Sequence, residues 1–119
     1  MAANPVGPTG DLQLSTQKKA EGTIVRGSGR ITSATSDLLQ STIRGLIPGT
    51  SRIVLDLAQV SYIDSSGVGA LVSAFVAASR ARCELELTNL QPRVRDLFEL
   101  SRLTAVFESR GGYRGLTPD

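Results

Sequence analysis

The chain has 119 residues with 13 basic and 11 acidic side chains, and its formal net charge of +2 gives no case for nucleic-acid binding. It contains no histidine and a single cysteine, which excludes a Ser-His-Asp or Cys-His catalytic apparatus and an internal disulfide, and argues against a zinc site. Its apolar runs are too short to span a bilayer, so a reducing, cytoplasmic location without membrane contact is the simplest expectation.

The first part of the chain predicts two strands. Leu12 and Leu14 alternate with polar residues, which indicates a short first strand. Residues 22–32 indicate a second strand, which is interrupted by Gly27 and Gly29. A bulge or close backbone packing explains these glycines better than a phosphate-binding loop, because no helix follows them directly.

The middle of the chain predicts two helices around a buried strand. Residues 33–47 carry apolar side chains at helical spacing and are stopped by Pro48-Gly49. Residues 52–58 are almost continuously apolar, as a central parallel strand should be. After a short loop, residues 66–82 predict an amphipathic helix. Its expected apolar stripe consists of Val68, Leu71, Val72, Phe75 and Val76.

The last part predicts a half-buried strand and a helix. Residues 83–88 alternate strictly, which is typical of a strand near a sheet edge. Pro92 is expected to begin the helix, since proline is favoured at the first helical position. Residues 105–107 predict a last short strand, and residues 109–119 a flexible tail. In the alternating strand one face carries Cys83, Leu85 and Leu87, and the other carries Glu84 and Glu86.

This order of elements predicts an α/β fold. Strands joined by helical crossovers should be parallel, whereas the first two strands can pair antiparallel. We therefore expect a four- to five-stranded mixed sheet with helices packed mainly on one face. It should form one domain over residues 11–108, preceded by a disordered leader over residues 1–10.

The segment Asp64-Ser65-Ser66-Gly67 places two hydroxyls where a strand leads into a helix, which is where open α/β sheets usually carry their sites. Aspartate and serine are favoured N-caps, so capping alone explains them, and the local pattern favours that reading. Because no histidine can activate a serine here, the alternative is a site acted on by another enzyme. Gly67 and Gly69 support the alternative, since they leave the serines unobstructed. We expect Ser65 to lie just ahead of the helix and Ser66 to supply the cap.

The remaining polar residues carry weaker signals. Two carboxylates, Asp56 and Asp64, do not define a magnesium site, and no metal site is predicted. Cys83 is interpreted as a small core residue. A solvated helix face is the interpretation of Arg93, Arg95 and Arg102.

Two stretches of the sequence resemble the STAS domain of bacterial anti-sigma factor antagonists. In residues 53–69 a D-L-x-x-V strand is followed by D-S-S-G-V-G. The similarity continues through residues 85–90 and 94–103, and it spans residues 22–107 in all. The combination of the strand with D-S-S-G-V-G is specific, and it favours a functional serine over a simple cap.

The resemblance implies a regulatory cycle in which the chain is a substrate and catalyses nothing. In that family the serine matching Ser65 is phosphorylated by a serine kinase that is itself the anti-sigma factor, with Ser66 here as the alternative acceptor. The unphosphorylated protein binds that kinase and frees the sigma factor, and a metal-dependent serine phosphatase restores it. No cofactor is implied, and a weak homodimer is left open. The expected partner contacts are Tyr62, Asp64, Ser65, Ser66, Gly67 and Val68.

One segment departs from the family pattern. Family members often carry acidic residues in a G-E-L-D-like segment at the end of the second strand, whereas here the segment is Gly29-Arg30-Ile31-Thr32. This departure keeps two other functions open. One is a STAS module in a signalling scaffold, and the other is a module that binds a small molecule or anion beside a transporter.

Overall fold

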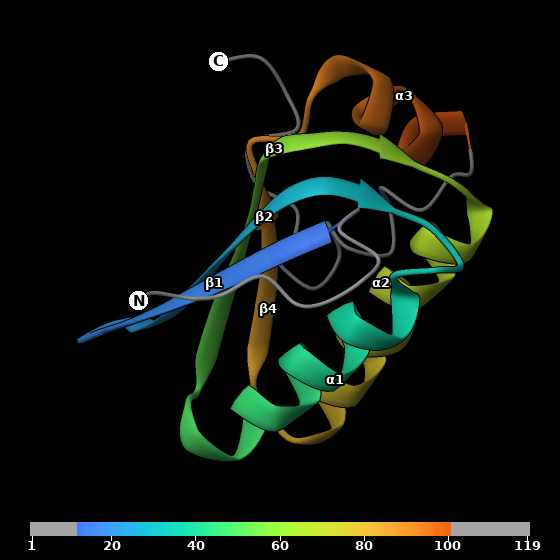
Figure 1. Cartoon of the computed structure of the whole chain (residues 1–119). Helices are drawn as coiled ribbons and strands as arrows, with labels where there is room; N and C mark the ends of the chain where they lie inside the picture. The colour runs from blue at the N-terminus through green and yellow to red at the C-terminus, as the bar shows by residue number, and fades with distance from the viewer. Residues whose placement is uncertain (1–11, 101–119) are drawn as a thin grey trace.

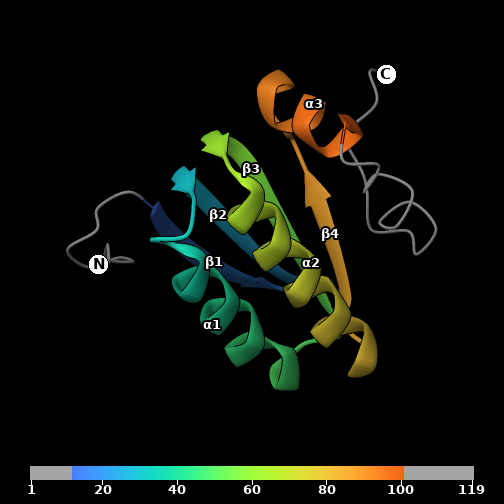
Figure 2. The same cartoon turned by 90° about the vertical axis from the view of Figure 1, so that its right-hand side faces the viewer.

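The computed structural model describes residues 12–100, which form a sheet with helices packed against it (Figure 1). The elements are β1 (Leu12–Lys19), β2 (Gly22–Ile31), α1 (Ser36–Leu46), a 3-10 turn (Ile47–Gly49), β3 (Arg52–Ile63), α2 (Ser65–Arg80), β4 (Glu84–Thr88) and α3 (Pro92–Leu100). The four strands pair in the order β1-β2-β3-β4. Helices α1 and α2 lie side by side on one face of this sheet (Figure 2). The predicted α/β fold with a mixed sheet is confirmed.

Strands β1 and β2 form an antiparallel hairpin, as expected for the first two strands. β1 is eight residues long, and its pairing with β2 extends well past the two leucines that indicated it. Gly22 opens β2 with a φ of 145°. A methyl group on Gly22 would lie 2.5 Å from the carbonyl oxygen of Arg52, so glycine lets the hairpin approach the start of β3.

The remaining strands are parallel and are connected through α1 and α2, which confirms the predicted crossovers. β3 continues to Ile63, five residues beyond the predicted end, because β2 pairs with it as far as Ile31. The pairing shifts by one residue at two places, between Arg26 and Ser28 and again between Gly29 and Arg30. The shifts lie at the two glycines, where a bulge or close backbone packing was predicted, but the extra residue at each shift belongs to β3 and not to β2.

The core lies between the sheet and the pair α1 and α2. Of the predicted α2 stripe, Val68, Leu71 and Phe75 are buried, while Val76 is 42% exposed. The outward position of Val76 contradicts the predicted stripe, because small residues occupy the buried side of α2 and bring the helix close to the sheet. The further buried residues of α2 are Gly67, Ala70, Ala74 and Ala78.

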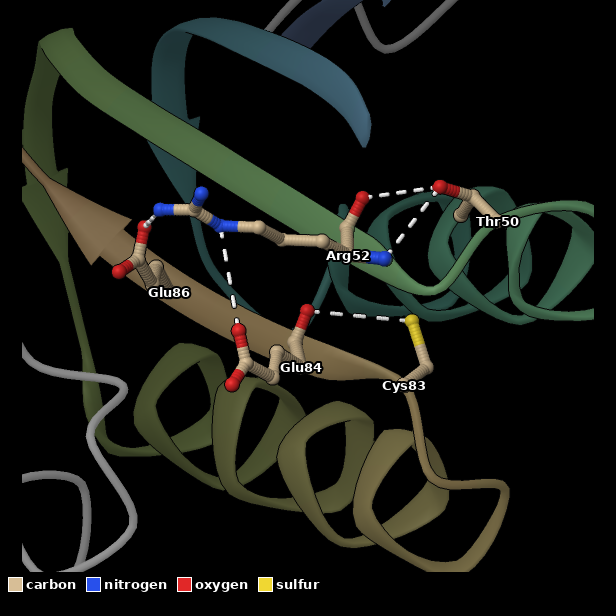
Figure 3. A network of polar contacts seen from close by, with 5 residues as sticks. All are labelled: Thr50, Arg52, Cys83, Glu84 and Glu86. Carbon is tan, nitrogen blue, oxygen red and sulfur yellow. Dashed lines mark hydrogen bonds and ion pairs between the residues drawn. The ribbon is translucent and has the colours of Figure 1, made fainter. Parts of the chain in front are cut away.

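The opposite face of the sheet carries an ion pair that the alternating pattern did not reveal (Figure 3). Glu86 was expected on the more polar face of its strand, yet it is only 4% exposed, and Arg52 Nη2 lies 2.6 Å from its Oε1. The pairing with Glu86 raises the pKa of the Arg52 guanidinium. Glu84 remains exposed, and Cys83, whose thiol pKa burial raises, lies in the core as predicted.

Helix α3 begins at Pro92, as predicted, and lies at the end of the sheet to which β3 and β4 point (Figures 1 and 2). Val94 and Phe98 anchor it in the core, and the Gln91 side chain donates to the Ala58 carbonyl at 2.8 Å. No helix within residues 12–100 has the length and apolar character needed to cross a membrane. The predicted leader, the strand at residues 105–107 and the tail at residues 109–119 lie outside the described residues.

Candidate functional site

The start of α2 is set by Asp64. This residue follows the last residue of β3 and has extended backbone angles, φ −111° and ψ −173°. The Gly67 N–H donates to Asp64 Oδ1 at 2.9 Å, which is the bond of an N-cap. The expectation that Ser66 supplies the cap is therefore wrong, because β3 extends to Ile63 and the helix begins one residue earlier than predicted.

Ser65 and Ser66 are the first two residues of α2, and both side chains are exposed. Within residues 12–100 neither hydroxyl forms a hydrogen bond. Ser65 thus lies at the beginning of the helix, and not just ahead of it as predicted. The free backbone N–H groups and the dipole of this helix end favour negative charge nearby.

Gly67 holds the start of α2 against the end of β2. A side-chain carbon on Gly67 would overlap the Ile31 carbonyl oxygen and would lie 2.7 Å from Ile63 Cγ1. The predicted role of the glycines, to leave the serines unobstructed, therefore gives way to close packing at Gly67, while Gly69 faces open space. Val68 is also buried, so these two of the expected partner contacts support the site from beneath.

The turn between β2 and α1 lies against the start of α2. The Asp64 N–H donates to the Ile31 carbonyl at 3.2 Å. The Ser36 hydroxyl donates to the Thr32 carbonyl at 2.7 Å and lies 3.4 Å from the Ser66 carbonyl. These bonds couple the position of the two serines to the segment that departs from the family pattern.

Arg30 lies directly opposite Tyr62 in the pairing of β2 with β3. Its guanidinium carbon is 5.5 Å from the centre of the Tyr62 ring, which is within range of a cation–π contact. Tyr62 is 44% exposed and belongs to β3, although the sequence placed it in a loop. A cation thus lies beside the site, within the Gly29–Thr32 segment.

A groove of about 510 Å³ runs between the start of α2 and helix α3. One wall consists of residues 61–65, at the end of β3 and the start of α2. The sequence did not reveal the other wall, because Arg93 was interpreted as part of a solvated helix face. The predicted parallel strands were the one signal of this wall, since the segments that follow neighbouring parallel strands lie at the same edge of the sheet. The wall on α3 consists of Arg93, Val94, Asp96 and Leu97.

The groups that this site presents to solvent are mainly hydroxyls. Two exposed hydroxyls lie at a helix N-terminus, and the carboxylate beside them is bonded to the backbone. Among residues 12–100 no three acidic, cysteine or histidine side chains gather as metal ligands. The site thus presents two exposed serines, one of which lines the open groove.

Known proteins give a family match, relatives in sequence and solved structures of similar fold. Residues 13–113 match the STAS domain family. A candidate anti-sigma factor antagonist of Bordetella bronchiseptica, BtrV, is 30% identical over 94 residues, which cover 77% of this chain and 81% of that protein. The fold is similar to that of an anti-sigma factor antagonist from Mycobacterium paratuberculosis, with a TM-score of 0.74, 17% identity and coverage of 93% and 92% of the two chains. It is also similar to the Bacillus cell fate determinant SpoIIAA in its phosphorylated form, with a TM-score of 0.64, 21% identity and coverage of 89% and 91%.

Proposed function

Because this chain belongs to the STAS domain family, we propose that it is an anti-sigma factor antagonist controlled by phosphorylation of Ser65. In this proposal the unphosphorylated form binds an anti-sigma factor that is a serine kinase, and a sigma factor is released. Phosphorylation ends the binding, and a metal-dependent serine phosphatase restores it. The cycle runs in the cytoplasm, and the chain is the substrate of both enzymes.

The observation that carries the proposal is that Asp64, and not Ser65, caps the start of α2. A serine at a helix start is most simply explained as a cap, but here the Asp64 carboxylate makes the capping bond. The Ser65 hydroxyl is exposed and has no hydrogen bond within residues 12–100. Its phosphorylation therefore breaks no hydrogen bond of the helix cap. Ser66 is also exposed but does not line the groove, so Ser65 is the proposed main acceptor.

The modification is an ordinary phosphoryl transfer. Ser65 Oγ forms a bond to the γ-phosphorus of ATP as the bond to the leaving ADP oxygen breaks. The hydroxyl proton passes to a base of the kinase, as in other protein kinases, where an aspartate of the catalytic loop accepts it. The phosphatase reverses the change with water, which yields serine and inorganic phosphate.

The charge added by phosphorylation explains why binding is lost while the fold survives. A phosphoryl group brings about −1.5 to −2 charges at neutral pH. The helix N-terminus stabilises such a charge by about 0.3–1 kcal/mol, and repulsion from Asp64 opposes this by a similar order. A partner packed over Ser65 would instead bury an unpaired dianion, which costs several kcal/mol, and about 1.4 kcal/mol is already tenfold in affinity.

The proposed contact surface is the exposed part of the site. It includes Tyr62 and the hydroxyls of Ser65 and Ser66, with the edge of the groove beside them. Arg30 adds a positive charge where relatives often have a negative one, so the matching patch of this chain's partner should be acidic or neutral.

Phosphorylation by the cognate anti-sigma kinase tests the proposal. The wild-type chain, Ser65→Ala and Ser66→Ala are incubated with the kinase and ATP, and the phosphorylated peptide is mapped. We expect full incorporation in the wild type and in Ser66→Ala, and almost none in Ser65→Ala. Equal incorporation in all three proteins would refute Ser65 as the acceptor. A chain that is never phosphorylated would favour the scaffold or transporter-associated module instead.

A further inference from the structure

The groove beside Ser65 has a cation on its far wall. Arg93 is the second residue of α3, and its side chain is exposed and lines the groove together with Ser65. Within residues 12–100 Arg93 forms no ion pair and no side-chain hydrogen bond. An arginine with no ion pair or side-chain hydrogen bond in the described fold thus lines the same groove as the proposed phosphorylation site.

The other charges around the groove make Arg93 the natural partner of an anion at Ser65. Two carboxylates line the groove, Asp64 and Asp96. The Asp64 carboxylate is already bonded to the Gly67 N–H, and Asp96 lies on α3, on the same wall as Arg93. Arg30 is stacked on Tyr62 at the end of β3 and does not line the groove. Arg93 is therefore the guanidinium that can enter the groove without breaking a contact within the described residues.

We propose that Arg93 binds the phosphoryl group of phosphorylated Ser65 and so closes the groove within the molecule. The guanidinium presents a planar fork of donors that matches phosphate oxygens, and its long side chain can turn toward α2. This proposal rests on the proposed function, because it assigns the receiver of the phosphoryl group that the kinase adds. Phosphorylation then acts twice, since it adds charge and also removes the space between α2 and α3 from the partner.

The phosphate itself reports whether Arg93 is bound. Phosphoserine is incorporated at position 65 during translation, so no kinase is needed, and its second ionisation is followed by phosphorus NMR. A neighbouring cation favours the dianion and lowers the phosphate pKa from its usual value of about 6. We expect Arg93→Gln to raise this pKa by roughly half a unit, and the difference to fade in about 1 M salt.

Arg95→Gln is the matched control, because it removes the same charge from the same helix at a residue that does not line the groove. It should leave the phosphate pKa nearly unchanged, and Arg93→Lys should restore part of the effect of arginine. Identical pKa values in the wild type and Arg93→Gln, or equal shifts in Arg93→Gln and Arg95→Gln, would overturn the proposal. A failure of the kinase to modify Ser65 would refute the proposed function but would leave this measurement unaffected.

Discussion

Two groups of charged residues lie at opposite ends of β3, and they are built in opposite ways. At its start, Arg52 and Glu86 are 2.6 Å apart, and the Glu86 side chain is only 5% exposed (Figure 3). After its end, Arg93 and Asp96 line an exposed groove and form no ion pair with any residue of the described part. Charges that the fold has already paired contribute to stability, whereas charges left open beside a reachable serine are available to other molecules.

The largest expected effect is on the affinity for the partner, and it tests the open end of this comparison at the groove. Ser65→Asp should weaken binding of the anti-sigma partner by about 100-fold or more, because a buried unpaired charge costs several kcal/mol. Ser65→Ala should bind like the wild type, and both variants should unfold close to the wild-type midpoint. Calorimetric titration against the partner measures the affinities. Equal affinities of the two variants would show that the site is not read by charge.

The next largest effect is on stability, and it tests the other end of the comparison at the pair of Arg52 and Glu86. Glu86→Ala leaves the Arg52 guanidinium without its 2.6 Å partner and should lower the free energy of unfolding by about 1–3 kcal/mol, because the Arg52 side chain is 32% exposed and water can replace part of the lost contact. Glu84→Ala is the control, since its side chain is 72% exposed and lies 4.0 Å from Arg52 Nε. It should cost less than about 1 kcal/mol. Urea unfolding of both variants decides, and similar losses would mean that the buried pair carries no special weight.

A smaller effect concerns the packing that positions the serines. Gly67→Ala pushes a methyl group into Ile31 and should cost about 1–3 kcal/mol. Gly69→Ala meets nothing within 4 Å and should stabilise the helix by up to about 1 kcal/mol. Thermal unfolding should therefore move in opposite directions for these two neighbouring glycines. A shift in the same direction would contradict the close approach of α2 to β2.

The smallest effect sharpens the assignment of the cap. Asp64→Ala removes the acceptor of the Gly67 N–H and should cost about 1 kcal/mol of stability. Ser66→Ala should change stability by less than about 0.5 kcal/mol, because its hydroxyl is exposed and makes no bond within the described residues. If Ser66→Ala proved the more damaging of the two, the capping role would belong to the serine.

The succession of strands and helices was predictable because apolar residues repeat at the strand or helix period along most of the chain. The predictions were wrong where that repeat is interrupted. In β3 two bulges interrupt the alternation, so Tyr62 was placed in a loop. Asp64, Ser65 and Ser66 are all favoured N-cap residues, so the sequence alone could not decide among them. Asp64 is the cap because β3 ends directly before it.

Two features of the structure depended on contacts between distant segments. Glu86 has the spacing of a solvated residue, yet it is buried and accepts a hydrogen bond from Arg52, which lies 34 positions away. Arg93 has the spacing of a solvated helix face, and it lines the groove only because α3 lies at the same sheet edge as the start of α2. Periodicity in one segment cannot report either contact.

Because of the two bulges, β3 can change in length without changing which residues of β2 lie opposite its end. Each one adds a residue to β3 that has no counterpart in β2, and after both additions Ile63 still lies opposite Ile31. Loss of Ser61 would remove one extra residue and leave Tyr62 and Ile63 facing the same neighbours. Natural insertions and deletions should therefore collect at these two points, where evolution can change the length of the strand without moving the serine that follows it.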